Sequence, residues 1–300
     1  MCVLIRADSS SIIGTGHIMR DLVLAKQFDE EVIFATQNLK GNINQNILEE
    51  GYSVEILLDN TIDELDNLIK RLSVTMIVID SYNIDFSFEE KLKQRNPLLK
   101  IFVLDDTYEK HCCDILLNHS LCAEKSRYIG LVPDGCELRC GAEYILLRDE
   151  FYKEKLSIPV EKENSDFCVL VIMGGADHSN INIKVLNVLE SIGRLRAIVI
   201  TTHANSNLKE LQSFCEKKMW IDLQINSNKI AQLMKQSDLA IVTPSGTVNE
   251  ICFIGTPFIA IKTAKNQECM HEYLNMNNEV ALEKFNAEKL TFEIKRKMKG

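Results

Sequence analysis

Residues 3–28 read VLIRADSSSIIGTGHIMRDLVLAKQF and contain the parts of one βα unit. The first six residues are mostly apolar, which predicts a strand. Residues 17–28 repeat apolar side chains at steps of three and four, which indicates an amphipathic helix. The polar, glycine-containing stretch between them supplies the turn. The segment therefore predicts the first unit of a parallel α/β sheet.

The same alternation continues through both halves of the chain. Further strands are expected at residues 31–37, 53–58, 75–82, 100–106 and 113–120, and then at 167–175, 195–202, 217–226, 239–246 and 256–263. Helical patterns lie between most of them. Continuous apolar strands separated by helices are typical of a parallel sheet covered on both faces. The expected fold class is therefore α/β, with two Rossmann-like, doubly wound domains.

A polar, proline-containing segment at residues 150–164 separates the two series. We expect an N-terminal domain at residues 1–155 and a C-terminal domain at residues 156–300, with an interdomain cleft. The basic stretch at residues 285–300 is expected to be a solvated terminal helix. In open parallel sheets, ligands bind outside the carboxyl ends of the strands. The residues that follow each strand are therefore the candidates for function.

The bulk composition argues against several classes of protein. A formal net charge of −9 makes nucleic acid an unfavoured main partner, because phosphate neutralisation needs a basic surface. No apolar run is long enough to cross a bilayer, and the start of the chain has no export signal, so we expect a cytoplasmic protein that does not contact the membrane. We see no dimer seam and expect a monomer.

The ten cysteines show no CxxC motif and no zinc-finger spacing. Cys112 and Cys113 are adjacent, Cys136 and Cys140 enclose three residues, and Cys168 lies inside an apolar run. Buried thiols in a reducing compartment explain this pattern better than a metal site does. We therefore expect no metal.

The loop after the first strand carries the most informative candidates. Gly14 and Gly16 allow tight turning and close approach of a ligand. His17 falls at the start of the next helix, where the helix dipole disfavours a cationic imidazole, so it is a candidate general base. Asp8 stands at the end of the strand. A plain strand-to-helix turn would explain the same residues, and the spacing alone does not decide between the two interpretations.

Other strands of the first half also end in polar groups. Asp80 and Tyr82 follow one strand, and Asp105 and Asp106 follow the next. Carboxylates gathered at one sheet edge can orient sugar hydroxyls or a catalytic histidine. Each aspartate alone could equally be a helix N-cap.

The second half offers loops suited to an anion. Gly174 and Gly175 follow a strand and can turn backbone N–H groups toward a phosphate. Ser245 and Gly246 could begin a helix whose N-terminus points at a phosphate. Glu250 could accept hydrogen bonds from ribose hydroxyls, or it could be the glutamate of a capping box. Asn266 follows the last strand and adds a hydrogen-bonding group at the same edge.

Together these stretches resemble the PseG family, the UDP-2,4-diacetamido-2,4,6-trideoxy-β-L-altropyranose hydrolases of pseudaminic acid biosynthesis. The resemblance runs from residue 3 to about residue 275. It rests on residues 3–28 and on IVIDSYNID at 77–85, VLDD at 103–106, HCCDILLN at 111–118, GLVPDGCELRCGAEYILLRDEFY at 130–152, MGGAD at 173–177, SGTVNE at 245–250 and KNQE at 265–268.

The resemblance implies a GT-B-like fold related to MurG, with UDP held mainly by the C-terminal domain. It implies hydrolysis of the C1–O bond of a small nucleotide sugar, release of UDP, anomeric inversion and a place in flagellin glycosylation, without a cofactor. His17 matches the catalytic base and Glu250 the nucleotide-binding glutamate. Tyr82 and Asn266 match residues of the substrate site, and Asp8, Gly174 and Ser245 match more loosely.

Three other functions stay open on the sequence. A GT-B glycosyltransferase would use the same donor site but transfer the sugar to an acceptor. A UDP-sugar 2-epimerase would cleave by elimination and exchange the hydrogen at C2 with solvent. A regulator would bind a nucleotide sugar without turnover.

Overall fold

The computed structural model describes residues 2–158, 166–177 and 179–299. The chain divides into two compact units, Met1–Leu146 and Leu147–Gly300. Each unit is built on one sheet whose strands all run parallel, as the alternating sequence pattern predicts. The α/β fold class is therefore confirmed.

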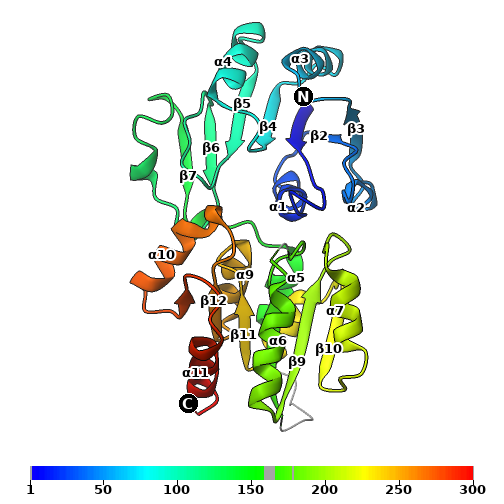
Figure 1. The fold of residues 1–300 in the computed structure, drawn as a ribbon. Coiled ribbons are helices and arrows are strands. Elements are labelled where there is room, and N and C mark those ends of the chain that lie inside the picture. The colour runs from blue at the N-terminus through cyan, green and yellow to red at the C-terminus, as the bar shows by residue number, and fades with distance from the viewer. Residues whose placement is uncertain (1, 159–165, 178, 300) are drawn as a thin grey trace. The chain divides into compact units, whose positions relative to one another are not determined.

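The first unit alternates strands and helices from its beginning (Figure 1). Its strands are β1 Cys2–Ala7, β2 Glu31–Gln37, β3 Ser53–Leu57, β4 Met76–Asp80, β5 Lys100–Leu104, β6 Ile115–Asn118 and β7 Glu137–Cys140. Its helices are α1 Gly16–Ala25, α2 Asn44–Glu49, α3 Ile62–Arg71 and α4 Phe86–Arg95, with short 3₁₀ turns η1 Lys125–Tyr128 and η2 Ala142–Tyr144. The strand order is β3-β2-β1-β4-β5-β6-β7.

Both faces of this sheet are buried, which is why its strands are apolar without alternation. Along β1, Cys2 and Leu4 contribute to a core under α3 and α4, whereas Val3 and Ile5 contribute to a second core under α1 and α2. Successive side chains of a strand point to opposite faces, so a strand covered on both sides needs an apolar residue at nearly every position.

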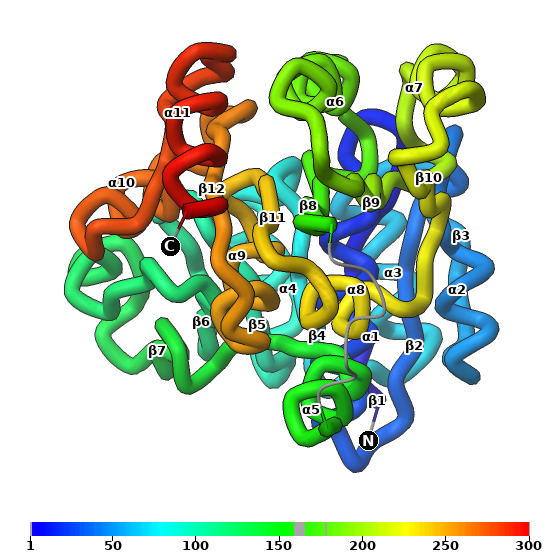
Figure 2. The backbone as a smooth tube through the Cα atoms, turned by 90° about the horizontal axis from the view of Figure 1, so that it is seen from below, coloured from blue at the N-terminus to red at the C-terminus, as the bar shows by residue number. Residues whose placement is uncertain are grey.

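The second unit repeats the plan. Its strands are β8 Phe167–Ile172, β9 Leu195–Thr201, β10 Ile221–Ile225, β11 Leu239–Val242, β12 Phe258–Ile261 and β13 Ala281–Leu282. Its helices are α5 Asp149–Leu156, α6 Ile181–Ile192, α7 Leu208–Cys215, α8 Ile230–Gln236, α9 Gly246–Ile254, α10 Glu268–Met276 and α11 Ala287–Lys297, with the 3₁₀ turn η3 Lys265–Gln267. The order is β10-β9-β8-β11-β12-β13. Figure 2 shows α6, α7 and α11 on one face of this sheet, and α8 and α9 on the other.

The strand order marks where each unit can bind a ligand. The chain reverses its direction of winding between β1 and β4 in the first unit and between β8 and β11 in the second. At such a switch point the loops that follow the two strands diverge and leave a crevice at the carboxyl edge. The loops after β1, β4, β8 and β11 carry most of the candidate residues.

The boundary between the units differs from the expected one. It falls between Leu146 and Leu147 rather than after residue 155. The reason is α5, which the polar sequence of this region did not indicate and which packs against α8 and α9 of the second unit. The short edge strands β7 and β13 were also not expected. Residues 159–165 of the expected boundary segment lie outside the described residues. Among the helices of the described residues, none has the length and apolarity that crossing a bilayer requires.

Candidate active site

The loop between β1 and α1 forms a tight turn ahead of His17. Ser10 and Gly14 exchange two backbone hydrogen bonds of 2.8 and 3.2 Å. Gly14 has a φ of +87°, which glycine adopts without steric cost. The Ser10 hydroxyl accepts two more backbone hydrogen bonds within the turn. Because α1 begins at Gly16, His17 lies in the first turn of the helix.

Asp8 holds the base of this loop. Its Oδ2 accepts a hydrogen bond of 2.7 Å from Arg6, and its Oδ1 accepts one of 2.7 Å from the backbone N–H of Gln37 in β2. The side chain is buried, at 4% exposure. Both carboxylate oxygens therefore have protein partners that fix the loop, and a contact of Asp8 with the sugar stays a prediction.

His17 is paired with a carboxylate from the neighbouring strand. Asp80 ends β4, and the parallel register of β1 and β4 sets Ala7 opposite Asp80. The loop after β1 returns α1 over this edge, so that Nδ1 of His17 lies 2.6 Å from Oδ1 of Asp80. Because an ionised carboxylate only accepts hydrogen bonds, we assign the proton of this bond to Nδ1. The pair lies at the switch point of the sheet.

Arg20 fixes the ionisation state of Asp80. Its Nε and one terminal nitrogen lie 2.6 and 2.5 Å from the two oxygens of Asp80. Burial would raise the pKa of Asp80, but the charges and hydrogen bonds of Arg20 and His17 hold it well below its usual range. Asp80 is therefore an anion at neutral pH, and its hydrogen bond orients the imidazole ring of His17.

Tyr82 and Asp106 extend the cluster toward solvent. Arg20 also binds Oδ2 of Asp106 at 3.2 Å, and the Tyr82 hydroxyl donates a hydrogen bond of 2.7 Å to Oδ1 of the same residue. The Tyr82 ring meets the His17 ring edge to face, with centroids 5.1 Å apart. Tyr82 is half exposed, at 54%. It thus presents a half-exposed aromatic surface directly beside His17.

Two further titratable groups lie behind the cluster. His119 accepts a hydrogen bond of 3.4 Å from Arg20, and burial together with the charge of Arg20 lowers its pKa to about 3. Asp21 is fully buried, and neither of its carboxylate oxygens has a hydrogen-bond partner among the described residues. Burial and the charge of Asp80 raise the pKa of Asp21 well above its usual value. His119 is therefore neutral at pH 7, and the raised pKa of Asp21 favours its protonated form.

From the sequence, Asp80 and Asp106 were expected only as strand-end carboxylates, and Arg20 and His119 were not expected at the site. A signal for Arg20 was present, because it lies three residues after His17 and side chains at this spacing share one face of a helix. No local pattern identified His119, since its contact with Arg20 joins residues that are distant in sequence.

In the second unit, Gly174 and Gly175 follow β8 directly. Gly174 has a φ of +82°, which favours glycine, and the Gly175 carbonyl accepts a hydrogen bond of 2.9 Å from the Thr202 hydroxyl. Asp177 then accepts backbone hydrogen bonds from the first turn of α6. The sequence MGGAD thus forms an ordered turn at the carboxyl edge of β8.

Ser245 and Gly246 begin α9 on the other side of this switch point. Ser245 occupies the N-cap position, but its side chain makes no capping hydrogen bond. Its hydroxyl lies instead 3.1 Å from that of Thr243. The N-terminus of α9 therefore presents backbone N–H groups and a serine hydroxyl at one place, which suits an anion.

Glu250 is not a capping-box residue, so that interpretation was wrong. With Ser245 at the N-cap, the third helical position is Val248, and Glu250 lies more than half a turn further along. Its Oε1 accepts a hydrogen bond of 3.3 Å from Arg148, which also binds Glu150 at 2.6 Å. Burial raises the pKa of Glu250, and the charge of Arg148 opposes this shift. Arg148 is a partner that the sequence did not reveal.

Asn266 lies exposed in η3, after β12. The neighbouring Gln267 fixes this turn, because its Oε1 accepts hydrogen bonds from the backbone N–H groups of Thr263 and Ala264 at 2.7 and 3.2 Å. Asn266 is thus carried on an ordered loop at the same sheet edge as Ser245.

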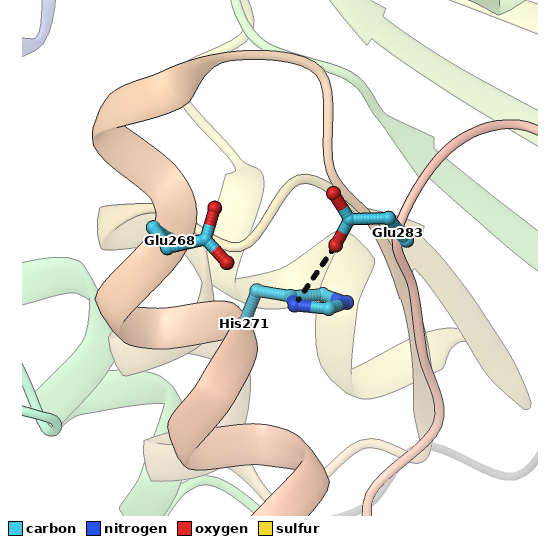
Figure 3. Close-up of side chains that lie close together, drawn as sticks. All are labelled: Glu268, His271 and Glu283. Carbon is cyan, nitrogen blue, oxygen red and sulfur yellow. Dashed lines mark ion pairs between the residues drawn. The ribbon is translucent and has the colours of Figure 1, made fainter.

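One group of side chains in the described residues has the residue types and the spacing of a candidate metal site. Glu268, His271 and Glu283 each offer one ligand atom, and these atoms lie within 4.8 Å of one another (Figure 3). The ammonium of Lys262, however, already binds both carboxylates, at 2.6 Å in the case of Glu283. A metal ion would have to displace this internal cation, so the cluster acts as an ion-pair network that joins α10 to the residue after β13.

The fold defines the class of protein. Two parallel, doubly wound sheets in one chain are the GT-B architecture, and solved structures share it. HepE of Anabaena, solved in complex with UDP, superposes with a TM-score of 0.67 at 11% identity and covers 100% of this chain and 90% of that one. MurG of Acinetobacter baumannii gives a TM-score of 0.63 at 11% identity, with 99% and 90% covered. The predicted GT-B-like fold is confirmed.

The sequence comparisons are more specific. Residues 169–297 match the glycosyltransferase family 28 C-terminal domain. Over 91% of its length, the chain is 41% identical to the UDP-2,4-diacetamido-2,4,6-trideoxy-β-L-altropyranose hydrolase of Campylobacter jejuni, and the match covers 96% of that enzyme. The chain belongs to the family of this hydrolase, which confirms the resemblance found in the sequence.

Proposed function

We propose that the chain hydrolyses UDP-2,4-diacetamido-2,4,6-trideoxy-β-L-altropyranose by direct attack of water on C1, with inversion at C1 and release of UDP. Membership of the hydrolase family supports the substrate and the reaction class. The observation that carries the mechanism is the buried pair of His17 and Asp80, held at 2.6 Å at the switch point of the first sheet.

His17 acts as the general base. With Nδ1 bound to Asp80, Nε2 takes a proton from the attacking water as its oxygen bonds to C1. The imidazolium that forms is stabilised by the anionic Asp80, which Arg20 keeps ionised. Tyr82, beside the His17 ring, contacts the sugar and limits where the water can stand. Gly14 and Gly16 let the loop backbone approach the sugar closely.

The bond from C1 to the UDP oxygen breaks as the new bond forms, and its electron pair leaves with UDP. The transition state has oxocarbenium character, as in other glycosidic cleavages. UDP leaves as a stabilised anion, so a protonating acid is dispensable. Attack from the face opposite the leaving group inverts the anomeric centre.

The second unit binds UDP. Backbone N–H groups at Gly174, Gly175 and the Ser245–Gly246 start of α9 bind the diphosphate and stabilise its developing charge. Glu250 accepts hydrogen bonds from the ribose hydroxyls, and its bond to Arg148 holds the carboxylate in place. Asn266, on the loop after β12, adds a hydrogen bond to the substrate.

Proton NMR of the purified chain with this UDP-sugar in D2O, without an acceptor, tests the proposal. We expect UDP and a stoichiometric free sugar that appears first as the inverted anomer and keeps hydrogen at C2. Turnover only with an added acceptor would show a glycosyltransferase, and deuterium at C2 would show a 2-epimerase mechanism. Binding of UDP without product would show a regulator. Each of these three results would refute the proposal.

A further inference from the structure

Two cysteines of the first unit, Cys113 and Cys136, are in direct contact. They lie beside β6 and β7, whereas the His17 cluster lies at β1 and β4. Sγ of Cys113 lies 3.6 Å from Sγ of Cys136. Cys113 precedes β6 and is 5% exposed, whereas Cys136 directly precedes the edge strand β7 and is half-buried. One thiol is therefore enclosed by the core, and the other can be reached by a small molecule from solvent.

The strand register brings the backbone segments that carry the two cysteines side by side. Ile115 of β6 stands opposite Glu137 of β7, and the Glu137 N–H donates a hydrogen bond of 2.9 Å to the Asp114 carbonyl. Cys136 directly precedes Glu137, and Cys113 lies two residues before Ile115, so the two cysteines stand at the beginning of the paired stretch of β6 and β7.

The two thiols also differ in reactivity. The hydrogen bond from Cys113 lowers the pKa of the Cys136 thiol, and the same bond together with burial raises the pKa of the Cys113 thiol. The half-buried sulfur is thus the better nucleophile, and the enclosed sulfur is placed to resolve whatever forms on it.

From the contact, the register and the difference in exposure, we propose that Cys113 and Cys136 are a modification site, a thiol pair that hydrogen peroxide converts to an intramolecular disulfide. The inference does not rest on the proposed hydrolase activity. The disulfide would tie the edge strand β7 to β6 and close the loop between them, which contains η1.

The chemistry balances with peroxide as the oxidant. The Cys136 sulfur attacks one peroxide oxygen, the O–O bond breaks, and the other oxygen leaves and is protonated to water. The Cys113 sulfur then attacks the sulfenic sulfur of Cys136. The S–S bond forms as the S–O bond breaks, and the leaving hydroxide takes the Cys113 proton as a second water. Two thiols are oxidised, and one peroxide is reduced to two waters.

Peptide mapping of the full chain tests the site. The protein is treated with hydrogen peroxide, remaining thiols are alkylated, and the product is digested with trypsin without reductant. Cleavage after Lys125 and Arg127 separates the two cysteines, so the new disulfide is detected as a link between peptide 111–125 and peptide 128–139 that the untreated protein lacks. Cys122 in peptide 111–125 is already disulfide-bonded, so the untreated protein is the reference. Dithiothreitol is expected to separate the two peptides again.

Matched variants identify the partner, because peptide 111–125 also contains Cys112 and the disulfide-bonded Cys122. We expect Cys112→Ser and Cys122→Ser to keep the cross-link, and Cys113→Ala and Cys136→Ser to lose it. Melting curves of the reduced variants check that each is folded. The proposal is overturned if peroxide oxidises other cysteines while these two peptides stay separate, or if the cross-link persists in folded Cys113→Ala.

Discussion

Asp80 and His17 are 63 residues apart in sequence, yet Oδ1 of the one lies 2.6 Å from Nδ1 of the other. Two neighbouring parallel strands bring them together, because β4 ends where the loop after β1 returns as α1. The carboxylate is 1% exposed and is held by Arg20 on both oxygens. This relationship gives the proposed base a fixed orientation and a counter-charge.

Replacing His17 tests the base directly. We expect His17→Ala and His17→Asn to lower kcat by at least about 100-fold, which is the usual contribution of a positioned general base. UDP affinity should be retained, since the proposed UDP residues belong to the second unit. Steady-state kinetics and calorimetric titration with UDP measure the two quantities. A kcat close to that of the unmodified chain would rule out the base assignment.

Asp80→Asn keeps the shape of the side chain and removes its charge. We expect kcat to fall by about 10²–10⁴-fold and the pH dependence of kcat/KM to change, because the imidazolium loses its counter-charge and the ring its preferred tautomer. Asp106→Asn is the matched control, since Asp106 also binds Arg20 but does not contact His17 in the described residues. Because Asp106 also accepts a hydrogen bond from Tyr82, the deciding measurement is the pH profile: an unchanged pH dependence of kcat/KM in folded Asp80→Asn would contradict its role as the counter-charge of His17.

Glu250→Gln should weaken UDP binding about ten-fold or more, the cost of losing hydrogen bonds to a charged acceptor, while kcat at saturation changes less. Glu150→Gln is the control, because Glu150 also binds Arg148. Calorimetric titration of both variants separates ribose binding from the loss of an ion pair. The same UDP dissociation constant in Glu250→Gln and in the unmodified chain would contradict the ribose role.

A buried network away from the proposed site makes stability depend on pH. His111 Nδ1 lies 2.7 Å from Glu89, and Nε2 lies 3.9 Å from Asp105. Burial alone would lower the pKa of His111, but the two carboxylates raise it from 6.5 to about 9. Because the folded pKa exceeds the unfolded one, the stabilisation is complete below pH 6.5 and is lost as the pH rises to about 9.

The loss over this window is up to about 3 kcal/mol in the free energy of unfolding. His111→Gln should therefore be less stable than the unmodified chain at pH 6.5, and this difference in the free energy of unfolding should narrow by pH 9. Urea unfolding at several pH values measures it. A stability difference that does not depend on pH would show that His111 has the same pKa in the folded and the unfolded chain.

Asp21→Asn should stabilise the fold at neutral pH. Burial and the charge of Asp80 raise the pKa of Asp21, so the unfolded chain loses its proton above about pH 4, whereas the folded chain keeps it to a higher pH. This linkage lowers stability as pH rises, and the neutral amide removes it. The melting temperature of the variant should exceed that of the unmodified chain at pH 7, and the excess should shrink toward pH 4. If the excess in melting temperature grew toward acidic pH, folding would lower the pKa of Asp21, contrary to the assigned direction.

Most of the secondary structure could be predicted from the sequence because hydrophobic periodicity is a local property. The strands of both series and the turn before His17 were predicted from it. The helix α5 was missed because its sequence, DEFYKEKL, is polar and buries only Phe151. The strands β7 and β13 were missed because they are short edge strands that need little apolar surface.

By itself, the sequence determined the α/β class, the family, and the position of His17 after a glycine turn, since each depends on residues that are close along the chain or on motifs in a fixed order. Only the tertiary structure decided that Asp80 and Arg20 are the partners of His17, that Arg148 binds Glu250, and that Cys113 meets Cys136. These contacts depend on which strands and helices lie side by side, which is settled by packing of the whole unit and not by any local stretch.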